Sequence, residues 1–178
     1  MSHITTYTGV RMYPAEPKTS DFHIEDIAHA LSLMTRANGH FETFYSVAQH
    51  CIACTLEARA RGYSKRVQLG CLLHDASEAY ISDITRPVKT LLPKYLEVES
   101  KLQNMIWEKW LGSPLSSDEY KQVFEIDDAM LYFEFMHFTG EQVIEKQPPL
   151  FAEISYDFKE FALVEEQYLN LFKELNKD

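Results

Sequence analysis

Long apolar runs and basic residues are both scarce in this sequence. Its uninterrupted hydrophobic stretches are a handful of residues long, far below the ~20 that a helix needs to cross a bilayer. Lys and Arg number 17 against 27 Asp and Glu, so the formal net charge is −10 with histidine neutral. A protein that coats duplex nucleic acid or an anionic membrane needs a cationic face. We therefore expect neither partner, whereas a small anionic substrate needs only a few local cations or a metal.

Cysteine is also scarce. The chain has three, Cys51, Cys54 and Cys71, and an odd number within apolar sequence does not suggest a disulfide framework. The first residues show no charged leader followed by an apolar run, so we expect a cytoplasmic protein. Cys51-x-x-Cys54 lacks the second ligand pair of a structural zinc site. We interpret these cysteines as small buried helix residues.

What remains is an ordinary globular composition, with 46% hydrophobic and 25% charged residues in 178, which predicts one domain over 1–178. Pro14 and Pro17 keep residues 4–20 irregular or β-like. The helical spacing of apolar residues predicts an all-α bundle of five to six main helices. We expect the first helix to begin at about residue 24 and to stop at 38–39. Further helices are expected at 46–61, 65–80, 93–111, 116–137 and 157–175. Residues 81–92 are expected to form a loop with one helical turn.

The segment from Leu72 to Tyr80 carries the strongest chemical signal. His74 and Asp75 are adjacent behind two leucines on a mostly apolar helix. A buried carboxylate is costly unless it is paired, protonated or bound to a metal. Glu78 follows one turn later, so it is predicted to share their face and to take or relay a proton.

Two other predicted helices offer polar side chains in similar apolar settings, namely His50 and Asp127. A lone histidine on an apolar face is usually a satisfied core residue, but three helices that each offer such groups favour a metal site. Two imidazoles and two carboxylates suit Mn, Co, Fe, Mg or Zn rather than a soft thiolate site. A divalent metal ion of this kind can activate water for attack on a phosphoryl group.

The order His50, His74-Asp75, Asp127 resembles the H…HD…D signature of the HD-domain metal-dependent phosphohydrolases. The stretches 45–50 (YSVAQH) and 74–78 (HDASE), followed by Asp83 and 86–89 (RPVK), are similar to the small 5′-deoxyribonucleotidase branch. Residues 26–32 (DIAHALS) and 36–40 (RANGH) resemble compact bacterial and phage versions, whose sister group hydrolyses dNTPs including dATP. The resemblance covers about residues 4–140.

The resemblance implies one HD-type domain with a divalent metal held by His50, His74, Asp75 and a fourth ligand. That ligand is Asp127 or Asp128, and the family pattern favours Asp127 because Leu131 and Glu134 follow four and seven residues later. It further implies roles for side chains around the substrate: Glu78 and Asp83 in catalysis, and Arg36, Lys89 and His40 in binding substrate or phosphate.

We therefore expect a metal-dependent phosphohydrolase that acts on (deoxy)nucleotides, either as a 5′-nucleotidase on dNMP or as a dNTP triphosphohydrolase. The sequence does not separate the two, since both reactions need the same metal cradle and phosphate-binding cations. The alternative is a non-catalytic nucleotide-binding or regulatory HD module. The aromatic run over 132–138 predicts core or a subunit interface, and we expect a homo-oligomer.

Overall fold

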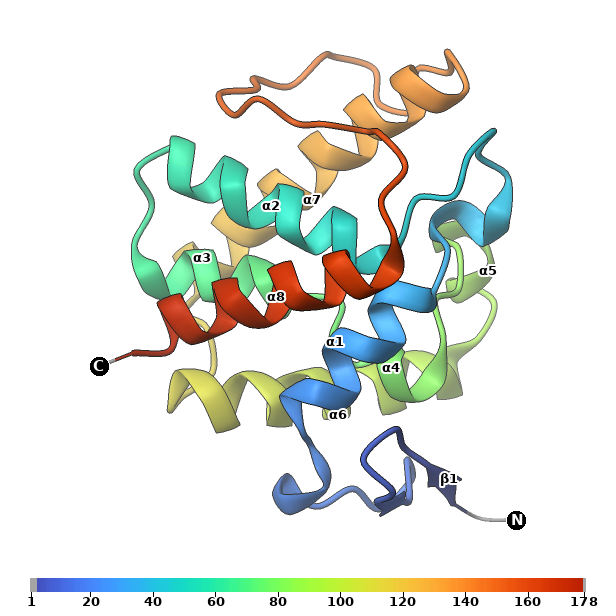
Figure 1. Ribbon diagram of the computed structural model, residues 1–178, viewed down its shortest axis with the longest axis vertical. Coiled ribbons are helices and arrows are strands. Elements are labelled where there is room, and N and C mark those ends of the chain that lie inside the picture. The colour runs from blue at the N-terminus through green and yellow to red at the C-terminus, as the bar shows by residue number, and fades with distance from the viewer. Residues whose placement is uncertain (1–2, 178) are drawn as a thin grey trace.

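A computed structural model describes residues 3–177, and it confirms an all-α fold with a short β-like segment at the N-terminal end (Figure 1). Strand β1 (Ile4–Thr5) pairs antiparallel with β2 (Arg11–Met12). Within these residues there are eight α-helices, of which α4 and α5 are single turns. The α-helices are α1 (Ile24–Leu33), α2 (Val47–Ala60), α3 (Lys65–Leu72), α4 (Glu78–Ile81), α5 (Arg86–Lys89), α6 (Pro93–Leu111), α7 (Ser117–Phe138) and α8 (Phe161–Leu175).

Local signals set several helix ends where the sequence predicts them. The Ser46 hydroxyl accepts from the backbone N–H of Gln49, whose side chain bonds back to Ser46, so α2 begins with a capping box. Pro93 occupies the first turn of α6, and Gly112 ends that helix with a left-handed φ of 74°. These ends match the expected helices at 46–61 and 93–111 to within a residue.

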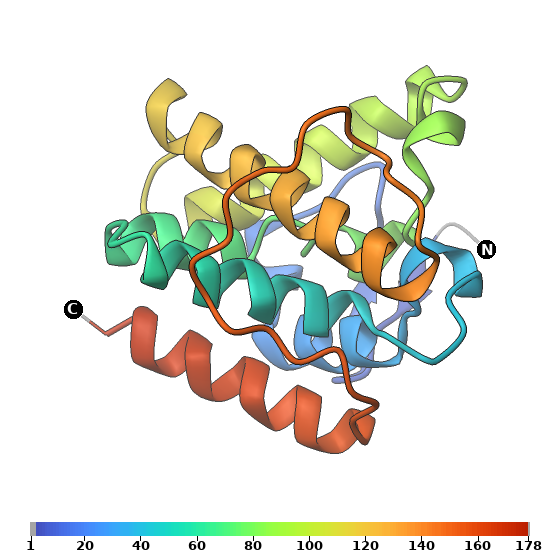
Figure 2. The same cartoon turned by 90° about the horizontal axis from the view of Figure 1, so that it is seen from above.

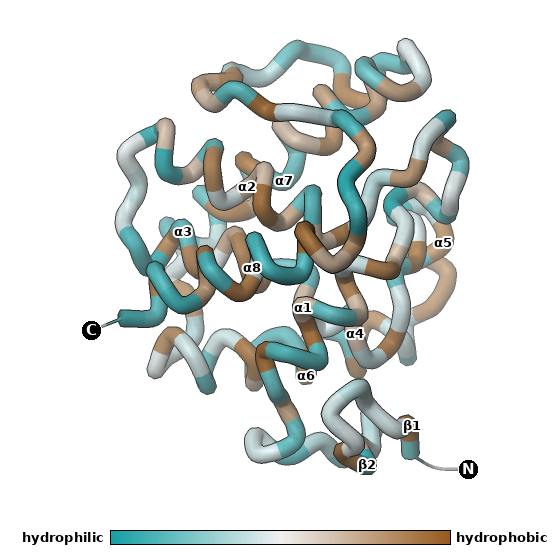
Figure 3. Tube along the Cα trace, viewed as in Figure 1, coloured by the Kyte–Doolittle hydropathy of each residue, from teal (hydrophilic) through white to brown (hydrophobic). Residues whose placement is uncertain are grey.

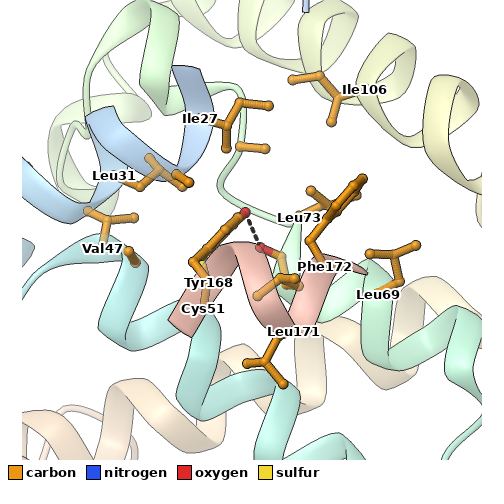
Figure 4. Packing of buried hydrophobic residues seen from close by; sticks show 14 of the residues in the cluster. Ile27, Leu31, Val47, Cys51, Leu69, Leu73, Ile106, Tyr168, Leu171 and Phe172 are labelled. Carbon is orange, nitrogen blue, oxygen red and sulfur yellow. Dashed lines mark hydrogen bonds between the residues drawn. The ribbon is translucent and has the colours of Figure 1, made fainter. Parts of the chain in front are cut away.

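The single helix expected over 65–80 is wrong, because α3 ends at Leu72 and α4 begins only at Glu78. A continuous helix would bond the carbonyl of Leu73 to the N–H of Ser77. Instead, the Gln103 side chain takes both groups: its Nε2 donates to Leu73 O at 2.7 Å and its Oε1 accepts from Ser77 N at 3.1 Å. The two preceding carbonyls also bond to side chains, Cys71 O to His74 and Leu72 O to Tyr168 (Figure 4). Residues 73–77 therefore form a tight turn.

The last helix begins at Phe161, not at 157 as expected, because Glu160 still has extended backbone angles. Residues 139–160, which we call the strap, contain no regular element and run back over α7 and α2 toward α8 (Figure 2). Glu57 on α2 fixes the strap, since its carboxylate accepts from the N–H groups of Phe151 and Ala152 at 2.8–3.2 Å.

Helix α8 completes the core by packing across α1, α2 and α3 (Figure 1). Apolar and polar residues alternate along it (Figure 3), and its buried face includes Val164, Tyr168 and Leu171. In the part of the chain described, no helix is both long and apolar enough to cross a bilayer. The core thus holds α2, α3 and the turn after α3 in fixed positions, and these elements carry His50 and His74.

Candidate metal centre

Four side chains from α2, the turn after α3, and α7 converge on one point beside the core. The Nε2 atom of His50 lies 3.2 Å from Nε2 of His74 and 3.1 Å from Oδ1 of Asp127. Oδ2 of Asp75 lies 3.3 Å from His74 Nε2 and 3.9 Å from His50 Nε2. The structure therefore brings together the four residues that the sequence nominated as metal ligands.

The second nitrogen of each imidazole is already committed. His50 Nδ1 lies 2.6 Å from Oε1 of Glu134, and His74 Nδ1 lies 2.7 Å from the carbonyl oxygen of Cys71. Both acceptors require Nδ1–H, which in a neutral imidazole leaves Nε2 as a bare lone pair. Two lone pairs that face each other at 3.2 Å need positive charge between or beside them.

The nearby carboxylates stabilise a positive charge between the two imidazoles. Burial opposes a positive charge on the imidazoles, and so does Arg36 at His50, yet nearby carboxylates raise the pKa of both His50 and His74. Burial alone would raise the pKa of Asp127, but hydrogen bonds with the imidazoles hold it well below the usual value. Asp75 Oδ2 is buried and forms no hydrogen bond within residues 3–177. An unpaired carboxylate oxygen beside two imidazole lone pairs fits a divalent cation.

The two candidates for the fourth ligand differ in their surroundings. The Asp127 side chain is 13% exposed and faces the imidazoles, whereas Asp128 is 51% exposed and bonds to Arg86 Nη1 at 2.9 Å. Arg86 also donates to Oδ2 of Asp127 at 3.2 Å. Asp127 is therefore the residue that the fold directs toward the centre, and Arg86 is a neighbour to which the sequence analysis gave no role.

Glu134 links the centre to a buried cation. One of its oxygens binds His50, and the other accepts from Arg36 Nε and Nη2 at 3.4 and 3.3 Å. Arg36 Nη1 lies 3.7 Å from Asp75. Seven residues separate Glu134 from Asp127, which places both on one face of α7 two turns apart. That spacing was the only signal in the sequence that Glu134 lies beside the metal centre.

Glu78 and Lys89 form a second polar cluster near the metal centre. Lys89 Nζ lies 3.0 Å from Oε1 of Glu78 and 2.6 Å from Oε1 of Glu99, while Oε2 of Glu78 is buried without a partner. One ammonium cannot neutralise two carboxylates. Burial, together with Asp75 and Asp83, raises the pKa of Glu78 well above its usual value, so its surroundings favour the protonated form of this carboxyl. Lys89, which the sequence predicts as a phosphate contact, lines the cavity and lies between these two glutamates.

The centre opens onto a cavity of about 760 Å³. His74, Asp75 and Asp127 lie in its wall, together with Glu78 and Asp83. Burial raises the pKa of Asp83, which forms no hydrogen bond within residues 3–177. Three cations line the same cavity, Arg36, Arg86 and Lys89. The cavity is also lined by the aromatic residues Trp107, Tyr120 and Phe124 and, from the strap, by Glu141, Val143 and Ile144.

His40 does not belong to this cavity, which corrects the prediction of a substrate contact there. Ala37 lines the cavity, but Ala37 and Asn38 both adopt left-handed backbone angles. The chain therefore turns away within three residues, and His40 is exposed.

No protein-family model matches the chain. It is similar to the uncharacterized protein YfdR of Escherichia coli K12, with 39% identity over 121 residues, which is 68% of this chain and 65% of YfdR. It is also similar to the uncharacterized protein RCAP_rcc00048 of Rhodobacter capsulatus, with 40% identity over 100 residues, or 53% of this chain and 51% of that protein. The chain thus spans less than two thirds of either relative, and neither name describes an activity.

Proposed function

We propose that this protein is a metal-dependent phosphohydrolase of the HD-domain type that acts on nucleotides. The observation that carries the proposal is the meeting of two imidazole Nε2 atoms, each with its Nδ1 committed elsewhere, beside Asp75 and Asp127 at the wall of a large cavity. When bound there, a divalent ion supplies Lewis-acid polarisation of a phosphoryl oxygen and a water nucleophile near neutral pH. The resemblance of the sequence to HD-domain phosphohydrolases supports the same reading.

Glu78 is proposed as the proton donor to the leaving oxygen. Its carboxyl group lines the cavity and has a raised pKa, so it holds a proton on entry of the substrate. General acid catalysis typically contributes 10²–10⁴-fold. Glu78→Gln should keep its metal and its substrate affinity while kcat falls by about that factor. An unchanged kcat would remove Glu78 from the mechanism.

The phosphate is proposed to lie among Arg36, Lys89 and Arg86. Arg36 is fixed by Glu134 and presents a rigid guanidinium to the cavity, whereas Arg86 is largely exposed at the rim. An arginine fork can contact phosphate through two parallel hydrogen bonds, which lysine cannot reproduce. Arg36→Lys should therefore lower kcat/KM for phosphorylated substrates far more than Arg11→Lys, a substitution at an exposed position of strand β2.

The remainder of the cavity suits a nucleoside. A cavity of about 760 Å³ lies within the usual range for small-molecule sites, roughly 300–1,000 Å³. Tyr120 and Phe124 lie with ring centroids 4.2 Å apart, and Trp107 meets Tyr120 edge-on at 6.1 Å. Aromatic faces of this kind stack well on a base. A deoxynucleoside monophosphate and a triphosphate both remain candidates.

A phosphate-release screen tests the proposal directly. Purified protein is stripped of metal, reloaded with Mn, Co, Mg, Fe or Zn, and assayed against NMPs, dNMPs and dNTPs. Release of phosphate from monophosphates, or of triphosphate from dNTPs, distinguishes the two reactions. Nucleotide binding without turnover for every metal would instead favour a regulatory HD module.

The adjacent aspartates give a matched control for the metal centre. Asp127→Asn should lower both metal content and activity, while Asp128→Asn should leave both near the wild-type level. Both carboxylates contact Arg86, so loss of that contact is common to the two variants. Equal effects of the two substitutions would contradict the assignment of Asp127.

We also propose a cytoplasmic, homo-oligomeric protein. The three cysteines are free and buried, which suits a reducing compartment. In the aromatic run over 132–138, Tyr132 and Phe138 are buried within the chain, whereas Phe133 and Phe135 are half-buried and can contribute to a subunit interface. Light scattering coupled to size-exclusion chromatography measures the oligomeric state.

A further inference from the structure

We propose that Cys54 is an additional ligand of the metal centre, a thiolate that reaches the ion from the protein interior. The inference rests on the proposed metal site at His50 and His74. The sequence alone suggested only that Cys54 is a small buried helix residue. Its position in the fold assigns it a second role.

The distances around His50 fit a sulfur ligand. Ligand bonds of about 2.0–2.1 Å to nitrogen and about 2.3 Å to sulfur, meeting at a tetrahedral angle, separate the two ligand atoms by about 3.6 Å. The Sγ atom of Cys54 lies 3.6 Å from Nε2 of His50. The ligand atoms of His50, Cys54 and His74 all lie within 4.8 Å of one another. One ion can therefore contact all three.

The helix places Cys54 on the correct side of the centre. It follows His50 by four residues on α2, so both side chains lie on one face of the helix. Cys54 is buried and absent from the cavity wall, whereas His74, Asp75 and Asp127 line it. A thiolate at this position binds the ion from behind and leaves the cavity side open for water and substrate.

The thiol has no other polar partner to explain its orientation. Its only hydrogen-bond contact within residues 3–177 is His50 Nε2, and its remaining neighbours belong to an apolar cluster that includes Ala129 and Met130. Ligation would form a sulfur–metal bond and break the S–H bond, with the proton released to solvent. A nitrogen, oxygen and sulfur donor set favours Zn, Co or Fe over Mg and Mn.

The other two cysteines provide the comparisons: Cys71 is the matched control, and Cys51, which groups with His74 and Asp75, is the competing thiol. Cys71 is buried in the same apolar cluster as Cys54 but belongs to neither group of potential ligands. Cys51 lies near His74 and Asp75, and it packs into the core beside Tyr168. Alanine at each position keeps a good helix-forming residue in the helix interior. The three substitutions are therefore closely matched.

The test is optical titration of the metal-free protein with Co²⁺. We expect visible d–d bands together with a near-ultraviolet sulfur-to-cobalt charge-transfer band. Cys54→Ala should retain the d–d bands and lose the charge-transfer band, while Cys71→Ala and Cys51→Ala retain both. Zn²⁺ affinity of Cys54→Ala should fall by at least the roughly 10–100-fold that loss of an outer hydrogen-bond partner costs, with Mn²⁺ affinity much less affected.

Two results would overturn the inference alone: d–d bands without a charge-transfer band in the wild-type protein, or a charge-transfer band that survives in Cys54→Ala. Absence of all cobalt bands would overturn both this inference and the metal centre on which the proposed function depends. Far-ultraviolet circular dichroism verifies that each variant is folded. Cys54→Ser provides a second variant if the alanine protein does not fold.

Discussion

Glu134 shows how one buried side chain can orient a site without lining its cavity. It is fully buried on α7, and its two oxygens bind different partners, His50 Nδ1 on one side and Arg36 on the other. The first contact fixes the imidazole tautomer so that Nε2 faces the centre. The second holds the guanidinium at the cavity wall.

Glu134→Gln is expected to weaken metal binding by roughly 10–100-fold, because a neutral amide supports the Nδ1–H of His50 less strongly than a carboxylate does. The measurement is competition with a metallochromic chelator. Glu125→Gln is the control, since Glu125 is exposed on the same helix. Equal affinities for both variants would show that Glu134 only fills space.

The ionisation of Glu78 links the site to stability. Burial and the negative charges of Asp75 and Asp83 raise the pKa of Glu78 in the folded state, so its ionised form is disfavoured by folding. A group with a raised folded pKa stabilises the fold below its unfolded pKa of about 4.3. This contribution is lost as the pH rises through the folded pKa.

Glu78→Gln should therefore be more stable than the wild type at pH 8, and the difference in the free energy of unfolding should vanish near pH 4. Glutamine keeps the shape of the side chain and cannot ionise. Urea denaturation of the metal-free proteins across this range measures the difference, with Glu125→Gln, at an exposed position of α7, as the control. If the stability difference between Glu78→Gln and the wild type instead shrinks as the pH rises, the pKa of Glu78 is not raised in the folded state.

Residue patterns in the sequence singled out four side chains that the structure brings close together, because histidines and carboxylates within apolar helices are conspicuous. They did not reveal the contacts of Lys89 with Glu78 and Glu99, nor the turn of the chain that carries His40 away from the cavity. Such contacts depend on which elements pack together. Spacing along one helix carries no information about them.

At the scale of elements, the turn over 73–77 is the feature that periodicity could not predict. Apolar spacing continues through it, so the sequence predicts one helix over 65–80. The break is stabilised by Gln103, which is remote in sequence and bonds to both Leu73 and Ser77. The turn, with the His74 hydrogen bond to Cys71, sets the direction of His74 and Asp75. Helices whose ends are encoded locally, such as α6, were predicted to within a residue.

Gln103→Met keeps the side-chain length but removes both hydrogen bonds. The buried N–H of Ser77 is left unpaired, while the Leu73 carbonyl keeps its bond from the N–H of Ala76. One buried group left unpaired costs about 1–3 kcal/mol, so we expect destabilisation of about that size in urea and weaker metal binding as the turn relaxes. Glu108→Met, at an exposed position of α6, is the control. A variant of wild-type stability and metal affinity would mean that the turn is set by other contacts.

For the whole molecule, the strap connects α7, which carries Asp127 and Glu134, to α8, which packs on α1, α2 and α3. It starts at the end of α7, contributes Glu141, Val143 and Ile144 to the cavity lining, and is tied to α2 at Phe151 and Ala152 before α8 packs onto the core (Figure 2). Irregular segments longer than about 12–15 residues are uncommon in compact domains unless they serve a function. The hydrogen bonds from Phe151 and Ala152 to Glu57 tie this long segment to α2.

Glu57→Ala should destabilise the protein and release the strap. The Glu57 carboxylate is fully buried. It pairs with Nε of Arg61 at 2.7 Å, and the Arg61 side chain is nearly buried as well. Removing one partner of a buried ion pair costs about 3–5 kcal/mol, measured by urea denaturation. Lys121→Ala, which removes an exposed pair with Glu125, should cost less than about 1 kcal/mol.

Limited proteolysis distinguishes local from global effects: cleavage within 139–160 should accelerate more than cleavage elsewhere. Acceleration that is uniform along the chain would show that Glu57 stabilises the whole fold and does not specifically hold the strap.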